Sequence, residues 1–210
     1  MNKLFAALLA VVPATARAST LELSSSQALR LFQDAGPSAR LLLASQGDPQ
    51  LRSRLYALAF QTGEAEKKLA ETQTGLHNIA LFVDYLSKTQ DGPRELRAHL
   101  ANFEEELGKL AGPLEGLAAP AEGLAAETKP ESRAADSADA LKAEALRLRA
   151  LCEGTAGAAD LLARNVAAAK DKLGEDAVAA SRRVARDAAA LSRLSDALVE
   201  RAEEIVRKSR

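Results

Sequence analysis

Leucine and alanine recur at alternating steps of four and three residues along two long stretches of the chain. The first stretch follows Asp48-Pro49, a capping residue and a first-turn proline that predict a helix start. Its periodic positions are Leu51, Leu55, Leu58, Thr62, Ala65, Leu69, Thr72, Leu76, Ile79, Val83 and Leu86. Those of the second stretch are Leu141, Ala145, Leu148, Cys152, Thr155, Ala159, Leu162, Val166, Ala169 and Leu173. This spacing predicts long helices with coiled-coil heptad seams.

Glycine and proline interrupt the same spacing between residues 91 and 127. After Asp91-Gly92-Pro93, the periodic positions continue as Leu96, Leu100, Phe103, Leu107, Leu110, Leu114, Leu117, Ala121 and Leu124. Pro113 and Pro120 each come just before one of these positions. An interior proline costs a helix about 3 kcal/mol or more, because it removes a backbone hydrogen bond and clashes with the preceding turn. The sequence therefore predicts a helical arm over residues 48–127 with breaks at 91–93 and 112–120.

Two architectures fit these stretches. Residues 49–127 and 131–209 are equally long, at 79 positions each, and could form the arms of one antiparallel hairpin with its tip near residues 128–130. Alternatively, the chain reverses fully at 91–93, and two shorter helices pack against one long helix. We therefore expect an all-α fold, an elongated antiparallel helical hairpin or bundle, in which residues 128–210 form one long C-terminal helix.

Two short helices are predicted ahead of these arms, over residues 19–47, with Gly36-Pro37 between them. The later half of the first periodic stretch, Leu51 to Leu86, is apolar beyond its periodic positions, at Ala80, Leu81, Phe82 and Tyr85. A helix that is apolar on several faces needs more than one packing partner. We expect the two short helices to pack there.

The first 18 residues have the pattern of a secretory signal peptide. A basic start at Asn2-Lys3 precedes the apolar run from Leu4 to Val12, and Ala16-Arg17-Ala18 fits a cleavage site before Ser19. The alternative is an N-terminal membrane anchor, but nine apolar residues are far short of the roughly 20 that span a bilayer. We expect cleavage after Ala18 and a periplasmic or secreted protein.

Composition supports helix packing and argues against nucleic-acid binding. Apolar residues make up 47% of the chain but aromatic residues only 3%, so alanine and leucine must fill most of the core. The net charge is −1, and the one basic cluster, Arg182, Arg183, Arg186 and Arg193, is interrupted by Asp187. A nucleic-acid-binding domain needs a denser basic face. We interpret this cluster as a solvated helix surface.

Reactive constellations are not evident in the sequence. His77 and His99 are far apart and lack a second histidine one helical turn away, so neither is predicted to bind a metal. Nucleophile and phosphate-loop motifs are also missing. We therefore predict no catalytic residue, no metal site and no cofactor. An enzyme with an unrecognised site is kept only as a third alternative.

Cys152 is the only cysteine and falls on a periodic position. In a parallel homodimer two such cysteines would face each other and could form an intermolecular disulfide in an oxidising compartment. The alternative is a buried thiol that behaves as a small apolar side chain. The candidate interface residues on this helix are Leu141, Leu148, Cys152, Leu162, Val166 and Leu173.

The sequence favours an exported structural or interaction protein of the cell envelope: a coiled-coil scaffold, a spacer or a chaperone-like clamp. Binding to a protein partner or self-association is expected. The alternative is a protein that binds lipid or a membrane surface. There the alanine-rich C-terminal helix, with Arg207, Lys208 and Arg210 near its end, would lie along the bilayer.

Overall fold

The computed structural model describes residues 47–210, which form one compact unit. The predicted signal peptide at 1–18 and nearly all of the two predicted short helices at 19–47 lie outside the described residues. Within residues 47–210, the regular structure is helical and contains no strand. The predicted all-α fold class is therefore confirmed for this part of the chain.

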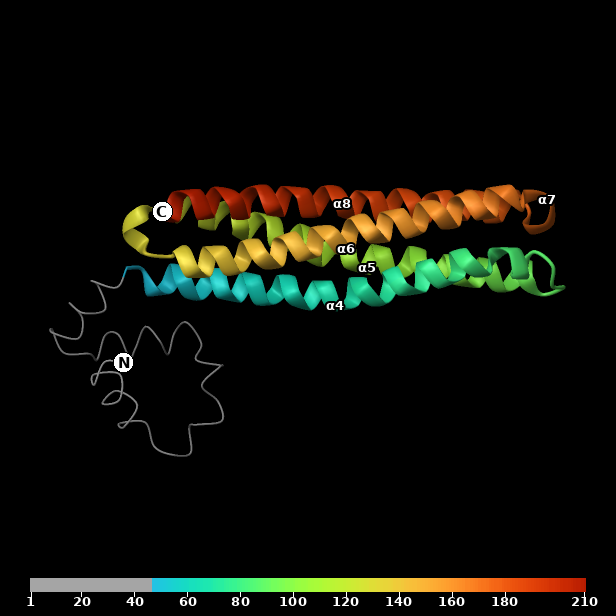
Figure 1. Cartoon of the computed structure of the whole chain (residues 1–210), viewed down its shortest axis with the longest axis horizontal. Helices are drawn as coiled ribbons and strands as arrows, with labels where there is room; N and C mark the ends of the chain where they lie inside the picture. Colours follow the sequence, from blue (N-terminus) through green and yellow to red (C-terminus); the bar gives the residue numbers. More distant parts are fainter. Residues whose placement is uncertain (1–46) are drawn as a thin grey trace, which may run out of the picture. The chain divides into compact units, whose positions relative to one another are not determined.

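Four long helices and two short ones make up this unit (Figure 1). The long helices are α4 (Pro49–Leu86), α5 (Gly92–Glu127), α6 (Ala135–Ala168) and α8 (Glu175–Ser209). The short ones are the 3₁₀ turn η2 (Pro130–Ser132) and helix α7 (Lys170–Leu173). Together the long helices form a four-helix bundle, in which α4 packs against α5 and α6, and α8 packs against the same two helices.

Two antiparallel helical hairpins build the bundle. Helices α4 and α5 run in opposite directions, and Arg54 near the start of α4 pairs with Glu127 at the end of α5. Helices α6 and α8 also run in opposite directions, and Lys142 near the start of α6 pairs with Glu203 near the end of α8. The two hairpins then lie side by side with equivalent helices parallel. Accordingly Asn165 of α6 donates a hydrogen bond of 2.8 Å to the carbonyl of Ala80 on α4, where both helices near their C-terminal ends.

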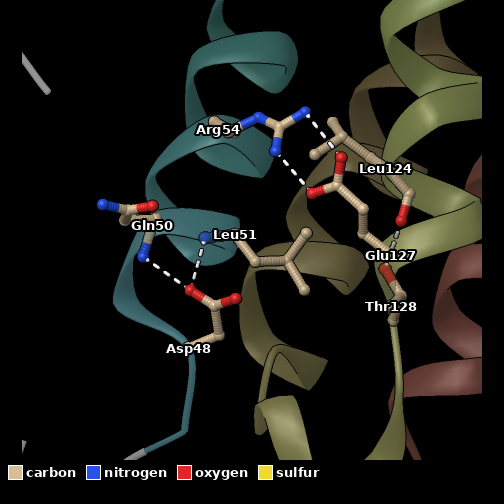
Figure 2. A network of polar contacts seen from close by, with 7 residues as sticks. All are labelled: Asp48, Gln50, Leu51, Arg54, Leu124, Glu127 and Thr128. Atoms are coloured by element: carbon tan, nitrogen blue, oxygen red, sulfur yellow. Dashed lines mark hydrogen bonds and ion pairs between the residues drawn. The ribbon is translucent and has the colours of Figure 1, made fainter.

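The start of α4 and the end of α5 meet at one end of the bundle (Figure 2). Asp48 caps α4, because its Oδ1 accepts hydrogen bonds from the backbone N–H groups of Gln50 and Leu51 at 2.9 and 3.0 Å. At the end of α5, the Thr128 hydroxyl donates to the carbonyl of Leu124 at 2.7 Å. The helix start predicted at Asp48-Pro49 is confirmed.

The hairpin alternative with its tip near residues 128–130 is wrong, because the chain already reverses between Leu86 and Gly92. This turn is tight: a Cβ on Gly92 would lie 1.8 Å from the carbonyl oxygen of Leu86, so only glycine fits. The single long C-terminal helix at 128–210 is also wrong. It is divided into α6 and α8 around Gly174, whose φ of +88° is readily adopted only by glycine.

The break predicted at 112–120 does not form, since α5 continues through Pro113 and Pro120. Both prolines are exposed on the outside of the helix. There, water can hydrogen-bond the carbonyl groups that lose their partner, and the proline rings do not disturb the core. The periodic positions that directly follow each proline, Leu114 and Ala121, remain buried.

Leucine side chains from all four long helices fill the interior. The largest fully buried ones are Leu51, Leu55, Leu69, Leu76, Leu96, Leu100, Leu107, Leu124, Leu141, Leu148, Leu162 and Leu191. Two polar periodic positions are satisfied within their own helices: Thr62 donates to the carbonyl of Leu58, and Thr155 donates to that of Leu151. The third, Thr72, is within hydrogen-bond distance of the carbonyl of Lys68, at 3.2 Å, and of Oε2 of Glu106 on α5, at 3.4 Å.

Candidate interaction surface

Aromatic side chains gather on the outside of α4. Residues 47–210 contain five aromatic residues, and one of them, Phe103 of α5, is buried. The other four lie on α4 with exposed fractions of 51% for Tyr56, 70% for Phe60, 58% for Phe82 and 62% for Tyr85. Leu81 beside them is also exposed. We call these five residues the α4 aromatic face: Tyr56, Phe60, Leu81, Phe82 and Tyr85.

The α4 aromatic face occupies one side of its helix. An α-helix turns by about 100° per residue, which places all five positions within an arc of about 100°. The buried positions of α4 face the other helices, so this arc points away from the bundle core. Five large apolar side chains are therefore exposed on the same side of α4.

Two clusters make up this face. The near cluster is Tyr56 and Phe60, close to the start of α4, and the far cluster is Leu81, Phe82 and Tyr85, close to its end. Along the helix axis about 32 Å separates Phe60 from Leu81. The exposed surface between them is polar, with Glu64, Lys67, Glu71 and Thr74.

A groove of about 660 Å³ between α4 and α6 adjoins the near cluster. Tyr56 and Phe60 line it together with the charged residues Glu66, Glu144 and Arg147. Arg147 Nε lies 3.1 Å from Oε2 of Glu144 and 3.8 Å from Oε2 of Glu66. Burial first, and then the neighbouring carboxylate of Glu144, raise the pKa of Glu66 to about 7, although Arg147 acts in the opposite direction.

A second groove of about 780 Å³ lies between α4 and α5. Its floor includes Phe103, Leu110 and Leu117, and charged residues such as Lys68 and Glu106 also line it. Gly75 on α4 helps to keep this groove open, because it contributes no side chain to it. A Cβ at Gly75 would come within 3.1 Å of the Phe103 ring, so glycine lets that ring lie against α4.

The six candidate interface residues of the second stretch are all in the bundle core. Leu141, Leu148, Cys152, Leu162, Val166 and Leu173 are between 0% and 4% exposed. Their apolar surface is covered by the other helices of the same chain, so in this fold they are not available to a second chain. Periodic spacing predicts that a position is buried, but it does not show which helix buries it.

Cys152 is fully buried and faces α8, where Ser195 is its neighbour. Burial raises the pKa of its thiol to about 11, despite a hydrogen bond with Ser195 that acts the other way. An intermolecular disulfide at Cys152 would require the bundle to open. In the structure Cys152 is a free, buried thiol, as the alternative interpretation expects.

The histidine residues and the basic cluster considered in the sequence analysis do not come together in one site. His77 on α4 and His99 on α5 are both exposed. No group of three or more histidine, cysteine, aspartate or glutamate side chains in residues 47–210 is placed to hold a metal ion. Arg183, from the predicted basic cluster, pairs with Glu104 of α5 at 2.9 Å. None of the helices in this part of the chain is both long and apolar enough to cross a membrane.

Comparison with known proteins does not assign this chain to a family. No protein-family model matches it, and no curated protein or solved structure is detectably similar to it. A functional assignment therefore depends on the surface itself. The α4 aromatic face is the most distinctive feature of that surface, and only its far cluster belongs to the apolar region predicted from the sequence. Tyr56 and Phe60 could have been found as aromatic residues at positions outside the periodic spacing.

Proposed function

We propose that this chain is an exported, non-catalytic interaction protein that binds another protein through the α4 aromatic face. The observation that carries the proposal is the distribution of aromatic residues. They are rare in the chain, and yet four of the five in residues 47–210 are exposed on one helix. If packing alone governed their placement, such large apolar side chains would be expected in the core.

The chemistry of this face fits protein binding. Tyrosine and phenylalanine are enriched at protein interfaces, and a few large side chains commonly contribute most of the binding free energy. The polar residues between the two clusters would form the hydrogen-bonding part of such an interface. Export is supported by the predicted signal peptide before Ser19.

The bundle would hold this face rigid and extended. Buried positions on α4 follow the four-and-three spacing, from which we infer coiled-coil packing between the helices. Helix α4 is 38 residues long, which corresponds to about 57 Å. The protein would thus work as a scaffold or clamp that binds along the outside of the bundle.

Photo-cross-linking in the producing cell tests the proposal. A photoreactive amino acid would replace Phe60 or Phe82 on the α4 aromatic face. The matched controls would be Ala101 of α5 and Ala197 of α8, which are also exposed. We expect a protein adduct from the two α4 positions and none from the controls. Equal yields from all four positions, or none at α4, would contradict a specific interface.

The N-terminus of the purified protein tests export. The predicted cleavage after Ala18 would leave Ser19 as the first residue, and mass spectrometry of the intact protein measures this directly. A chain that retains Met1 or residues 2–18 in the producing cell would argue against an exported protein. That result would leave the binding role of α4 unaffected.

The alternative function, binding to a membrane surface, was predicted for the C-terminal helix, but the apolar side of that helix is not exposed. The apolar side chains of α8, among them Val184, Leu191 and Leu198, are buried in the bundle and do not face outward. Membrane binding would therefore require the bundle to open or would use the α4 aromatic face. Liposome flotation of the purified chain distinguishes the two classes of partner, because a protein-binding surface leaves the chain in the soluble fraction.

A further inference from the structure

We propose that the protein bound by the α4 aromatic face is a second copy of this chain, packed in the antiparallel direction about a two-fold axis. This inference rests on the proposed function and names its partner. The evidence is the arrangement of apolar and charged residues along α4, whose two halves complement each other.

The two clusters are positioned to meet in an antiparallel pair. In an antiparallel pair, a step forward along one helix is matched by a step back along the other, so the numbers of facing residues have a constant sum. With a sum of 141, Tyr56 would lie opposite Tyr85 of the second copy, and Phe60 opposite its Leu81. The same pairing then repeats at the other end, as a two-fold axis requires. This axis would pass between Ala70 and Glu71. One contact would thus cover both apolar clusters on both copies.

Charges in the polar middle disfavour the parallel direction. In the antiparallel register, Lys67, which pairs with Glu64 of its own helix at 2.5 Å, lies opposite the uncharged Thr74 of the second copy. Lys67 is also within one helical turn of the second copy's Glu71. A parallel pair would also match the clusters, but it would place Lys67 against Lys67 and Glu71 against Glu71. Like charges directly opposite each other oppose association.

The exposed area is consistent with a reversible dimer. An aromatic side chain has about 150–250 Å² of surface, and half to two-thirds of it is exposed at these positions. The five side chains therefore offer about 500 Å² on each copy, or about 1,000 Å² in total, at the lower end of specific interfaces. We expect a dimer that dissociates on dilution.

The N-terminal segment of the same chain fits this face less well. From Gly47 to Leu81, the distance along α4 is about 50 Å. Residues 19–46, if wholly helical, would extend for about 42 Å, so a helical segment would not reach the far cluster. The earlier expectation that residues 19–47 pack against Ala80 to Tyr85 therefore requires part of this segment to be extended. A second copy reaches both clusters without this condition.

Sedimentation of the full chain, as purified from producing cells, tests the dimer. We expect the weight-average mass to rise from monomer to dimer as concentration increases. Phe60→Glu should weaken the dimer by about 100-fold or more, since the two-fold axis places the new carboxylate in both apolar contacts. Ala197→Glu on the outside of α8 is the matched control and should leave the dissociation constant unchanged. Far-ultraviolet circular dichroism verifies that both variants keep the helical fold.

A charge-exchange variant then tests the antiparallel register. Phe60→Glu combined with Leu81→Lys places opposite charges face to face only if residues 60 and 81 meet across the dimer. We expect the double variant to recover dimerisation to within about tenfold of the original chain. Weak association in both the single and the double variant would overturn the register.

A full chain that stays monomeric at all concentrations would overturn the dimer, including the case in which residues 19–46 cover α4. The proposed function would survive that result if photo-cross-links at Phe60 and Phe82 joined the chain to a different protein. Absence of both the dimer and the cross-links would overturn both proposals.

Discussion

Glu66 of α4 and Glu144 of α6 lie close together in the α4–α6 groove, where Arg147 contacts both carboxylates. Glu66 is the more enclosed of the two, with 16% of its side chain exposed, and its Oε1 atom is buried without a hydrogen-bond partner. Ionised, this carboxylate would be poorly solvated and next to a like charge. We therefore expect the contact between the two hairpins to be sensitive to pH.

Stability should fall as pH rises from about 5 to 7.5. The pKa of Glu66 is raised from 4.5 to about 7 in the folded state, so the folded chain binds the proton more tightly than the unfolded chain in this window. We expect Glu66→Gln to remove this pH dependence and to stabilise the protein at pH 7.5 by on the order of 1 kcal/mol. Urea unfolding at the two pH values measures the effect. Glu95→Gln, at an exposed site on α5, is the control, and an unchanged slope in Glu66→Gln would refute the assignment.

Leucines inside and outside the bundle should respond differently to truncation. Leu69→Ala removes a fully buried side chain of α4 and should lower the free energy of unfolding by about 2–5 kcal/mol. Leu81→Ala on the same helix removes an exposed one, and its effect on stability should be within about 0.5 kcal/mol. Denaturant titration of both variants compares them directly. Similar losses would mean that Leu81 is covered by other parts of the monomer.

Glycine positions in α5 should show opposite effects of an added methyl group. Gly92→Ala forces the new Cβ against the carbonyl of Leu86 and should destabilise the chain by more than about 3 kcal/mol, because the reversal cannot close. Gly108→Ala meets no atom within 4 Å in the middle of the same helix and should stabilise it by about 0.5–1 kcal/mol. Thermal unfolding of the two variants measures both signs. A stable Gly92→Ala variant would show that the turn differs from the one described.

The thiol of Cys152 should be unreactive in the folded protein. It is fully buried and its pKa is raised to about 11, so little thiolate is present at neutral pH and access is blocked. A colourimetric thiol reagent should modify it slowly in buffer and rapidly in denaturant. Non-reducing electrophoresis should show a monomer band. A disulfide-linked dimer under native conditions would indicate that the bundle opens in solution.

Much of the helix content could be predicted from the sequence. The periodic positions of the first stretch are buried, with Ile79 half-buried, because one side of a helix must face the core. What this spacing does not reveal is the identity of the packing partner. Leu148 and Cys152 were equally consistent with an interface between chains, and the structure shows that helices of the same chain cover them.

The remaining errors came from single residues whose effect depends on their surroundings. Gly174 ends a helix because of its positive φ, whereas Gly108 lies within one, and spacing alone does not separate the two cases. Pro113 and Pro120 are tolerated because they face outward. Tyr56 and Phe60 stand outside the periodic spacing, which the sequence shows, but the extent of their exposure is known only once α5 and α6 are placed around α4.

Hydroxyl-radical footprinting of the aromatic side chains tests most directly whether the α4 aromatic face is covered by a protein partner. Radical modification reports the solvent exposure of Tyr56, Phe60, Phe82 and Tyr85 without knowledge of the partner. We expect these four residues to be protected in intact producing cells and to react readily in the purified chain at high dilution. Equal reactivity in both conditions would contradict the account, because the face would then be exposed where the protein works.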